Sequence, residues 1–344
     1  MAKAHKNKRL ARRFGKKDNT KSIFQVSEPE VASHSHKNEK KSFYNKYYKQ
    51  LMIIPFLMLF LAFVALGFQY VDTGSFVNKG ISLTGGTSIT LTADMTDLST
   101  IDTTQLENNM RKAFPNADVS TRLQRQISEI VAIEIETDIS AETEAGEIEL
   151  QAFKEELVTL IGGITMDDVG QNVRSSGSAL GASFFKQIIF AMIAAFVLMG
   201  IVIFIQFKVP IPSFAVILAA FSDIVVTLAI VNLLGMKLST AGIAAFLMLI
   251  GYSVDTDVLL STRVLKNKEG SVYERVISAL KTGLTMNITT LVAVSVALIF
   301  SESQVISQIM TIIFIGLLVD MINTWFQNAG ILRIYTEKKE RENK

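Results

Sequence analysis

The chain has 344 residues, of which 49% are apolar, and its mean hydropathy of +0.35 does not fit two ordinary soluble domains. It contains no cysteine, and its three histidines, His5, His34 and His36, precede the first apolar stretch, so the sequence predicts no metal site, no cofactor and no enzyme built on cysteine or histidine. The formal charge of +2 divides into +10 over residues 1–71, −11 over 72–185 and +3 over 186–344, as expected of a chain that a membrane divides.

Residues 1–50 form a basic segment that we expect to be disordered and cytoplasmic. A removable signal peptide would place its apolar run directly after a short basic region, whereas the first apolar run here begins at Leu51. We therefore expect residues 51–71 to be a retained membrane anchor. Binding of nucleic acid or ribosomes is an alternative for the basic segment, but attraction to anionic membrane lipid explains it more simply, and we expect no nucleic-acid partner.

Six apolar stretches are each long enough to cross about 30 Å of hydrocarbon, which takes about 20 helical residues. They are Leu51–Val71, Ile188–Ile205, Ser213–Leu234, Leu238–Leu260, Ile277–Phe300 and Val305–Phe326. The sequence therefore predicts an α-helical polytopic membrane protein, with transmembrane helix 1 at residues 51–71, helices 2–6 within residues 188–328, and a tail at residues 329–344.

Lys and Arg residues in short flanking segments orient the predicted helices, because such residues tend to stay in the cytoplasm. One set of flanks contains the basic segment, Lys208, five basic residues between 263 and 281, and the tail. The opposite set offers only Lys237. We expect a multi-pass protein of the plasma membrane with both termini in the cytoplasm and residues 72–187 outside.

The segment at residues 72–187 has the alternating and helical patterns of a soluble α+β domain. In chain order we predict a strand, a helix, two strands, a helix and a strand, at Gly86–Ala93, Thr103–Phe114, Ala117–Arg125, Ser128–Thr137, Glu149–Ile161 and Asp167–Arg174. This βαββαβ order indicates a ferredoxin-like domain. Gly85 and Gly86 lack the ending of a phosphate-binding loop, so we expect a turn that enters the first strand.

Four carboxylates fall within the predicted spans, where an ionisable residue costs about 2.5–3.5 kcal/mol and is a functional candidate by default. They are Asp223, Asp255, Asp257 and Asp320, and the uncharged polar residues Asn287, Thr289, Thr290 and Asn323 accompany them. Lys281 enters the fifth span at about the depth of Asp257 and could pair with either carboxylate of the fourth span. A carboxylate that gains and loses a proton between helices would couple an ion gradient to movement; static hydrogen bonding of the bundle is the alternative.

Asp255 and Asp257 lie about 200° apart around the fourth predicted helix, so both cannot face the same partner. We favour Asp255 as the coupling residue. It is the deeper of the two, and Gly251, one turn away, leaves room for a neighbouring helix. Asp257 lies near enough to the interface for partial hydration.

Several motifs make the chain, over about residues 50–335, similar to the SecF side of the SecD/SecF protein-export family, within the resistance-nodulation-division superfamily. They are Gly80-Ile-Ser-Leu-Thr-Gly-Gly-Thr87, Ser222-Asp223, Gly251-Tyr-Ser-Val-Asp-Thr-Asp257 with Arg263, and Lys281 with Asn287-Ile-Thr-Thr290. Bacterial members usually carry Asn-Asp-Thr where this chain has Asp255-Thr256-Asp257. A gapless match therefore puts the family's proton-linked aspartate on Thr256, whereas the SecD pattern puts it on Asp255. These features resemble the archaeal branch.

The resemblance implies an accessory subunit of the Sec translocation channel that associates with SecD and contacts the exported polypeptide. It also implies that the proton gradient, or a sodium gradient, drives the cycle without covalent catalysis. Two alternatives stay open: a subunit for small-molecule efflux, and a purely structural stabiliser of SecD or the channel.

Overall fold

The computed structural model describes residues 43–126, 129–267, 269–301 and 303–342. The chain divides into residues 1–46 and a compact unit of residues 47–344, and the description that follows concerns the second unit. The basic segment predicted at residues 1–50 lies outside the described residues as far as residue 42, as does the predicted start of the fourth element at Ser128.

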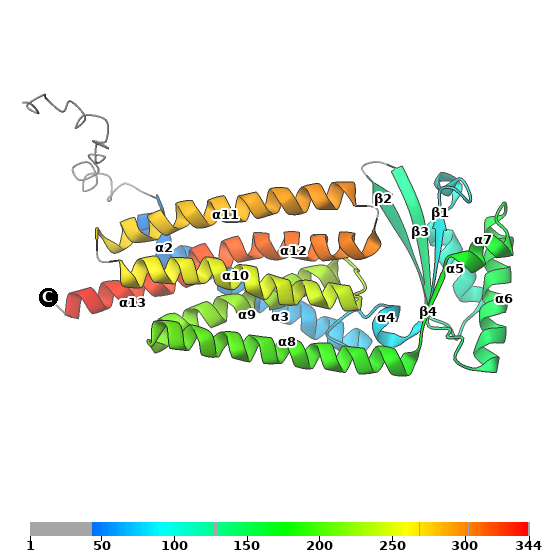
Figure 1. The fold of residues 1–344 in the computed structure, drawn as a ribbon, viewed down its shortest axis with the longest axis horizontal. Helices are drawn as coiled ribbons and strands as arrows, with labels where there is room; N and C mark the ends of the chain where they lie inside the picture. The colour runs from blue at the N-terminus through cyan, green and yellow to red at the C-terminus, as the bar shows by residue number, and fades with distance from the viewer. Residues whose placement is uncertain (1–42, 127–128, 268, 302, 343–344) are drawn as a thin grey trace, which may run out of the picture. The chain divides into compact units, whose positions relative to one another are not determined.

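Six helical stretches of the described chain are long and apolar enough to cross a membrane, as predicted. In chain order they are α2 and α3 (Phe43–Leu51, Ile53–Thr73), α8 (Ser178–Phe207), α9 (Pro210–Leu233), α10 (Thr240–Lys266), α11 (Val272–Phe300), and a last stretch made of α12 (Gln304–Ile322), η3 (Asn323–Asn328) and α13 (Ala329–Glu342). These helices lie side by side in Figure 1. The second and the last stretch extend beyond the predicted apolar runs, because residues 178–187 and 329–342 contain no helix-breaking proline and continue the same helices.

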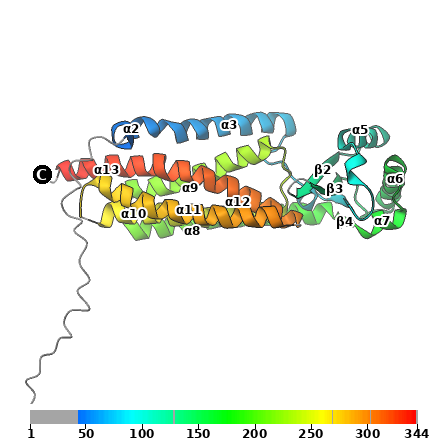
Figure 2. The ribbon, with the colours of Figure 1, turned by 90° about the horizontal axis from the view of Figure 1, so that it is seen from above.

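The centre of the bundle is formed by α9 and α10, which bury a larger share of their residues than the other helices. The buried side of α9 carries small residues, among them Ala215, Ala219 and Ser222, which let neighbouring helices approach closely. By contrast, α3 runs along one edge of the bundle in Figure 2, and it exposes apolar side chains such as Phe60 and Phe68. Exposed apolar side chains on a spanning helix suit contact with lipid.

The last stretch changes its winding where it crosses the bundle interior. Residues 323–328 form one π-helical segment, η3, between α12 and α13. Asn323, Thr324, Gln327 and Asn328 of this segment are all 0% exposed. A π-helical turn is wider than an α-helical one and recurs at functional sites. Here it places a set of polar side chains toward α9 and α10.

Between α3 and α8 the chain forms an α/β domain. Its elements are α4 (Ile81–Thr84), β1 (Gly86–Thr92), η2 (Leu98–Thr100), α5 (Thr103–Ala113), β2 (Val119–Gln126), β3 (Glu129–Thr137), α6 (Glu144–Ile161), α7 (Met166–Gln171) and β4 (Val173–Ser176). The sheet order is β2-β3-β1-β4, with every neighbouring pair antiparallel. A hydrophobic core that includes Ile89, Ile135, Met110 and Phe153 lies between one face of the sheet and helices α5 and α6.

The strand predicted at Asp167–Arg174 is wrong over most of its length. Residues 166–171 form the short helix α7, and only Val173 and Arg174 of the predicted strand belong to β4. The reason is a capping box, in which the Thr165 hydroxyl accepts from the Asp168 N–H while the Asp168 carboxylate accepts from the Thr165 N–H. These two bonds satisfy N–H groups at the helix start and favour a helical turn over a strand.

Candidate functional site

Three of the four aspartates predicted in the membrane lie inside the helix bundle. Asp223 on α9, Asp257 on α10 and Asp320 on α12 are each 0% exposed. Asp223 accepts two hydrogen bonds, one from the Ser253 hydroxyl at 2.5 Å and one from the Asn323 amide at 2.7 Å. A buried carboxyl group held by two donors is fixed in orientation, so Asp223 joins α9 to α10 and to η3.

Asp320 and Asp257 share one hydroxyl group. The Thr324 Oγ1 lies 3.0 Å from Asp320 Oδ1 and 2.9 Å from Asp257 Oδ1. A hydroxyl carries a single proton, so it can donate to only one of the two oxygens at a time. The other contact becomes a hydrogen bond only when the second carboxyl group holds a proton and donates it to the hydroxyl oxygen. This geometry suits a pair of aspartates that share a proton through Thr324.

Asp257 is the only one of these three aspartates with an open oxygen. Its Oδ1 accepts from Thr324 and from the Asn328 amide at 2.7 Å, whereas its Oδ2 is buried with no hydrogen-bond partner among the described residues. Asp320, by comparison, uses its Oδ2 to accept from the Asn287 amide at 3.1 Å. A buried carboxylate oxygen without a donor is costly unless it binds a proton or a cation.

The expectation that Asp255 faces a neighbouring helix across Gly251 is wrong. Asp255 and Gly251 are both exposed, and nothing lies within 4 Å of where a Gly251 side chain would begin. Asp257, expected near the interface, is instead buried. The reason lies in the helix period: α10 turns Ser253, Asp257 and Leu260 into the bundle, and Asp255 then points away from it.

Of the other predicted polar residues, Asn287 lies inside the bundle and Lys281 lies on its surface. Asn287 is buried and connects two helices, since its amide donates to Asp320 and its oxygen accepts from the Thr256 hydroxyl at 3.3 Å. Lys281 is exposed and forms no ion pair with either carboxylate of α10 in the part of the chain that the structure describes. The Thr290 hydroxyl donates to the Met286 carbonyl of its own helix.

Gly85 connects α4 to β1, and Gly86 is the first residue of that strand. Their φ angles are +85° and +128°, in the region that favours glycine. A Cβ atom on Gly86 would lie 2.3 Å from the Thr137 carbonyl oxygen, so the first strand could not approach β3 with a larger residue there.

Sequence reasoning missed Ser253, Thr324 and Asn328, which supply donors to the buried aspartates. The pattern Asn323-Thr324-x-x-Gln327-Asn328 in an otherwise apolar stretch was the available signal. At 100° per residue these four side chains lie within an arc of about 140° even on an ideal α-helix, so the spacing alone indicates one polar face, and the π-helical segment of the structure buries all four.

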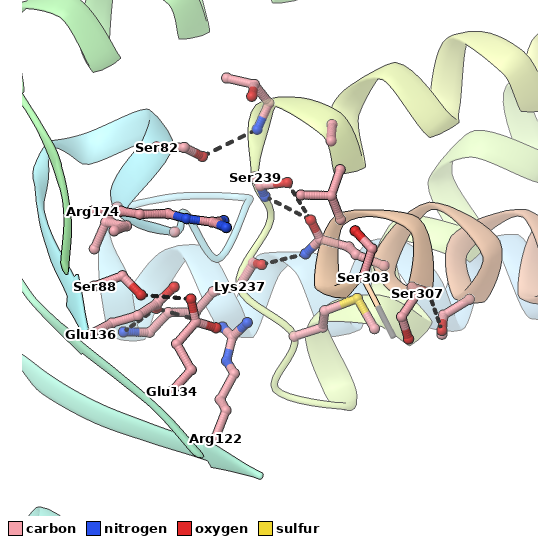
Figure 3. Close-up of a pocket in the computed structure, with 18 of the residues that line it drawn as sticks. Ser82, Ser88, Arg122, Glu134, Glu136, Arg174, Lys237, Ser239, Ser303 and Ser307 are labelled. Atoms are coloured by element: carbon pink, nitrogen blue, oxygen red, sulfur yellow. Dashed lines mark hydrogen bonds and ion pairs between the residues drawn. The ribbon is translucent and has the colours of Figure 1, made fainter. Parts of the chain in front are cut away.

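A second feature is a cavity of about 740 Å³ between the sheet and the ends of α10 and α12 (Figure 3). The face of the sheet that carries no helix lines one side, with Ser88, Arg122, Glu134 and Glu136. Lys237, in the connection between α9 and α10, lies 3.5 Å from Glu136 Oε2 and donates to the Ser120 hydroxyl at 2.5 Å. Burial raises the pKa of Glu134, as does the nearby charge of Glu136, while the hydrogen bond from Ser88 acts in the opposite direction.

Comparison with known proteins gives consistent matches. The family profile described as Protein export membrane protein SecD/SecF, C-terminal, matches residues 162–338. The chain is 38% identical to the protein-export membrane protein SecF of Pyrococcus furiosus over 292 residues, which cover 85% of this chain and 92% of that one. It is 39% identical to the SecF of Methanolacinia petrolearia over 294 residues, which cover 84% of this chain and 94% of that one.

Among solved structures, the fold is similar to that of SecDF, a translocon-associated membrane protein, from Thermus thermophilus. The TM-score is 0.63 at 19% identity, and the match covers 85% of this chain and 38% of that chain. The chain therefore spans about two fifths of the length of that larger protein.

Proposed function

Because the chain belongs to the SecD/SecF family of protein-export membrane proteins, we propose that it is an accessory subunit of the Sec translocase that uses a proton or sodium gradient to assist protein export. Its partners in this proposal are SecD, the Sec translocation channel and the exported polypeptide. The likeness to SecDF supports the first partner, since the match covers 85% of this chain but only 38% of that chain and so leaves room for a second subunit.

The proposal places the chain in the plasma membrane with both termini in the cytoplasm. The basic flanks support this orientation, because Lys208, the five basic residues between 263 and 281 and those of the tail belong to one set of helix ends, whereas the short connections of the opposite set carry only Lys237. The α/β domain then lies outside, and its sheet order β2-β3-β1-β4 supports a ferredoxin-like fold for it.

The observation that carries ion coupling is the Thr324 hydroxyl between Asp257 and Asp320. We place the entering ion on Asp257 Oδ2, the open oxygen, and the exchange of a proton with Asp320 on the Thr324 hydroxyl. Because Asp257 lies on α10 and Asp320 on α12, a change in charge at one of them alters the packing of the two helices. An ion gradient can shift the equilibrium between two packing arrangements of these helices only if the two arrangements bind the ion with different affinities.

The test compares two substitutions of the same kind two residues apart. Asp257→Asn removes the ionisable group from the buried site, and Asp255→Asn removes one from the exposed side of the same helix. We expect Asp257→Asn to slow export of a secreted protein in cells by about fivefold or more and to abolish its dependence on the gradient, because typical coupling energies are of that size. Asp255→Asn should leave both properties close to those of the unaltered protein.

The coupling ion is identified in the same cells. If a protonophore slows export and a sodium ionophore does not, the ion is the proton; the reverse result identifies sodium. Normal, gradient-dependent export by Asp257→Asn would reject the coupling role, and normal export by a variant neutral at Asp223, Asp257 and Asp320 would show that the chain is a structural stabiliser.

A further inference from the structure

The open face of the sheet is built from polar residues at every second position. The register pairs Ser88 on β1 with Glu136 on β3, and Glu134 on β3 with Arg122 on β2. The hydrophobic core occupies the opposite face of the same strands. Because successive side chains of a strand point to opposite faces, these polar side chains point toward the 740 Å³ cavity (Figure 3). A cavity of this size falls within the range of about 300–1,000 Å³ that is typical of ligand sites.

Arg122 is the charged group of this face that a ligand can reach. Its side chain is 28% exposed and lines the cavity, and its Nη2 has no hydrogen-bond partner among the described residues. Glu136 Oε2, by contrast, lies 3.9 Å from Arg122 Nη2 and 3.5 Å from Lys237 Nζ, so this carboxylate is paired with the protein's own cations. A guanidinium group carries five N–H donors, and an exposed one can donate to a peptide carbonyl.

The cavity also reaches the edge of the sheet. β4 pairs only with β1 in the described part of the sheet, so its other edge is unpaired, and Ser175 and Ser176 of this strand line the cavity. An unpaired edge offers N–H and C=O groups to an extended peptide, a recognition mode found in many peptide-binding domains. Arg174, on the same strand, is exposed beside the cavity (Figure 3).

The opposite wall comes from the helix bundle. It contributes Lys237, Ser239, Ser303 and Ser307 (Figure 3), together with apolar residues such as Met236 and Val305. Cations and carboxylates are mixed along the walls, with Arg122, Arg174 and Lys237 against the two glutamates. A lining that mixes apolar, polar and charged groups matches a polypeptide segment, which has a polar, neutral main chain and varied side chains.

We propose that this cavity binds an extended segment of polypeptide through its main-chain amides, with Arg122 donating to a carbonyl group and the edge of β4 pairing alongside. The inference rests on the proposed function, which supplies an extended polypeptide as the occupant. It deepens that function by assigning a place on this chain where the exported polypeptide is held.

The absence of cysteine from the chain makes the test direct. Ser303→Cys and Ser176→Cys place one thiol on each wall of the cavity, and Ser99→Cys places one on an exposed site of η2 outside it. Each variant is produced as the full chain, in membranes with its partner subunits. The probe is an exported precursor with a single cysteine in its mature part, stalled during export by a folded domain at its end. We expect disulfide cross-links from the two cavity positions and none above background from Ser99→Cys.

A second pair of variants tests the recognition chemistry. In the Ser303→Cys background, Arg122→Met removes the guanidinium group from the cavity, and Arg111→Met removes one from the exposed surface of α5. We expect Arg122→Met to lower the cross-link yield about tenfold, the effect of losing one charge-assisted hydrogen bond, and Arg111→Met to leave it unchanged. An unchanged yield with Arg122→Met would overturn the assignment of Arg122.

The outcomes separate this inference from the function on which it rests. If the cavity positions cross-link no better than Ser99→Cys, or cross-link only to a partner subunit, the inference is wrong. Asp257→Asn tested in the same cells still reports on gradient coupling. Cross-linking to the precursor together with normal export by Asp257→Asn would keep the binding site and reject the coupling mechanism.

Discussion

Lys237 Nζ lies 3.5 Å from Glu136 Oε2 and thereby joins the connection between α9 and α10 to the central strand β3 of the sheet. The same connection is bound by main-chain groups, because the Gly80 N–H donates to the Leu238 carbonyl and the Leu238 N–H donates to the Asn78 carbonyl. The helices that carry Asp223 and Asp257 are thus linked to the α/β domain through a few residues. In the proposed function, this is the route that carries a change in helix packing to the domain.

The Lys237 contact leads to a prediction about this junction. Lys237→Gln removes the nearer of the two cations beside the buried Glu136, so we expect the junction to lose about 1 kcal/mol. Hydrogen exchange at the amides of Gly80 and Leu238, measured by mass spectrometry on the full chain, should then quicken about fivefold. Lys112→Gln, at an exposed position of α5, is the control and should leave those amides unchanged. Equal exchange in the two variants would mean that the main-chain bonds alone hold the junction.

Glu134 gives a prediction about pH. Burial raises the pKa of Glu134 above its ordinary value, so the folded domain binds the proton more tightly than the unfolded chain does. Its stability therefore falls as the pH rises from the unfolded pKa, about 4.3, through the folded pKa, and the loss is complete above both. Glu134→Gln removes this loss while keeping an acceptor for the Ser88 hydroxyl, which donates to Glu134 at 2.7 Å.

We expect the Glu134→Gln substitution to make β1 and β3 more protected from hydrogen exchange at pH 7 than they are in the unaltered protein. The gain should shrink toward zero as the pH approaches about 4, where the native carboxyl group is largely protonated in both states. Exchange rates are corrected for the intrinsic effect of pH, and Glu155→Gln, on the exposed side of α6, is the control. A gain that is the same at both pH values would show that the substitution acts through packing and not through charge.

Thr324 permits a test of proton sharing with two substitutions of similar size. Thr324→Ser keeps the hydroxyl between Asp257 and Asp320, and Thr324→Val replaces it with a methyl group. We expect Thr324→Val to slow the gradient-dependent part of export about tenfold, equivalent to about 1.4 kcal/mol, and Thr324→Ser to retain most of it. The measurement is the export rate with and without a protonophore, at matched amounts of protein in the membrane. If serine and valine behave alike, the hydroxyl is not the relay.

The spans and the sheet were predictable because their patterns are long and regular. The six spans can be identified from the length of their apolar stretches alone, and the alternation of apolar and polar residues over 129–137 predicts β3 directly. The strand predicted at residues 167–174 failed because it is short, and there a single capping interaction between Thr165 and Asp168 outweighs the weak alternation.

The membrane site was predictable in its residue types but not in its geometry. Asp223, Asp320 and Asn287 were chosen correctly as residues of the bundle interior, since polar groups in a span are costly and usually face other helices. The choice between Asp255 and Asp257 depends on the rotation of α10, and a sequence with polar residues on several sides of a helix does not determine it. Packing does: in the structure the buried side of α10 includes Ser253, which donates to Asp223, and Asp257, which follows Ser253 by one turn.

Gly86 offers a test of how tightly the first strand fits. Gly86→Ala would place a Cβ atom 2.3 Å from the Thr137 carbonyl oxygen at a φ of +128°, and neither backbone can move aside without breaking the β1–β3 pairing. Strain of this kind costs about 1–3 kcal/mol from the dihedral angle alone. Gly170→Ala, in α7, is the matched control, because nothing lies within 4 Å of its Cβ position and its φ is negative. We expect less folded protein in membranes for Gly86→Ala, measured by resistance to protease, and no loss for Gly170→Ala; equal amounts of the two would mean that the turn between α4 and β1 tolerates a side chain by shifting.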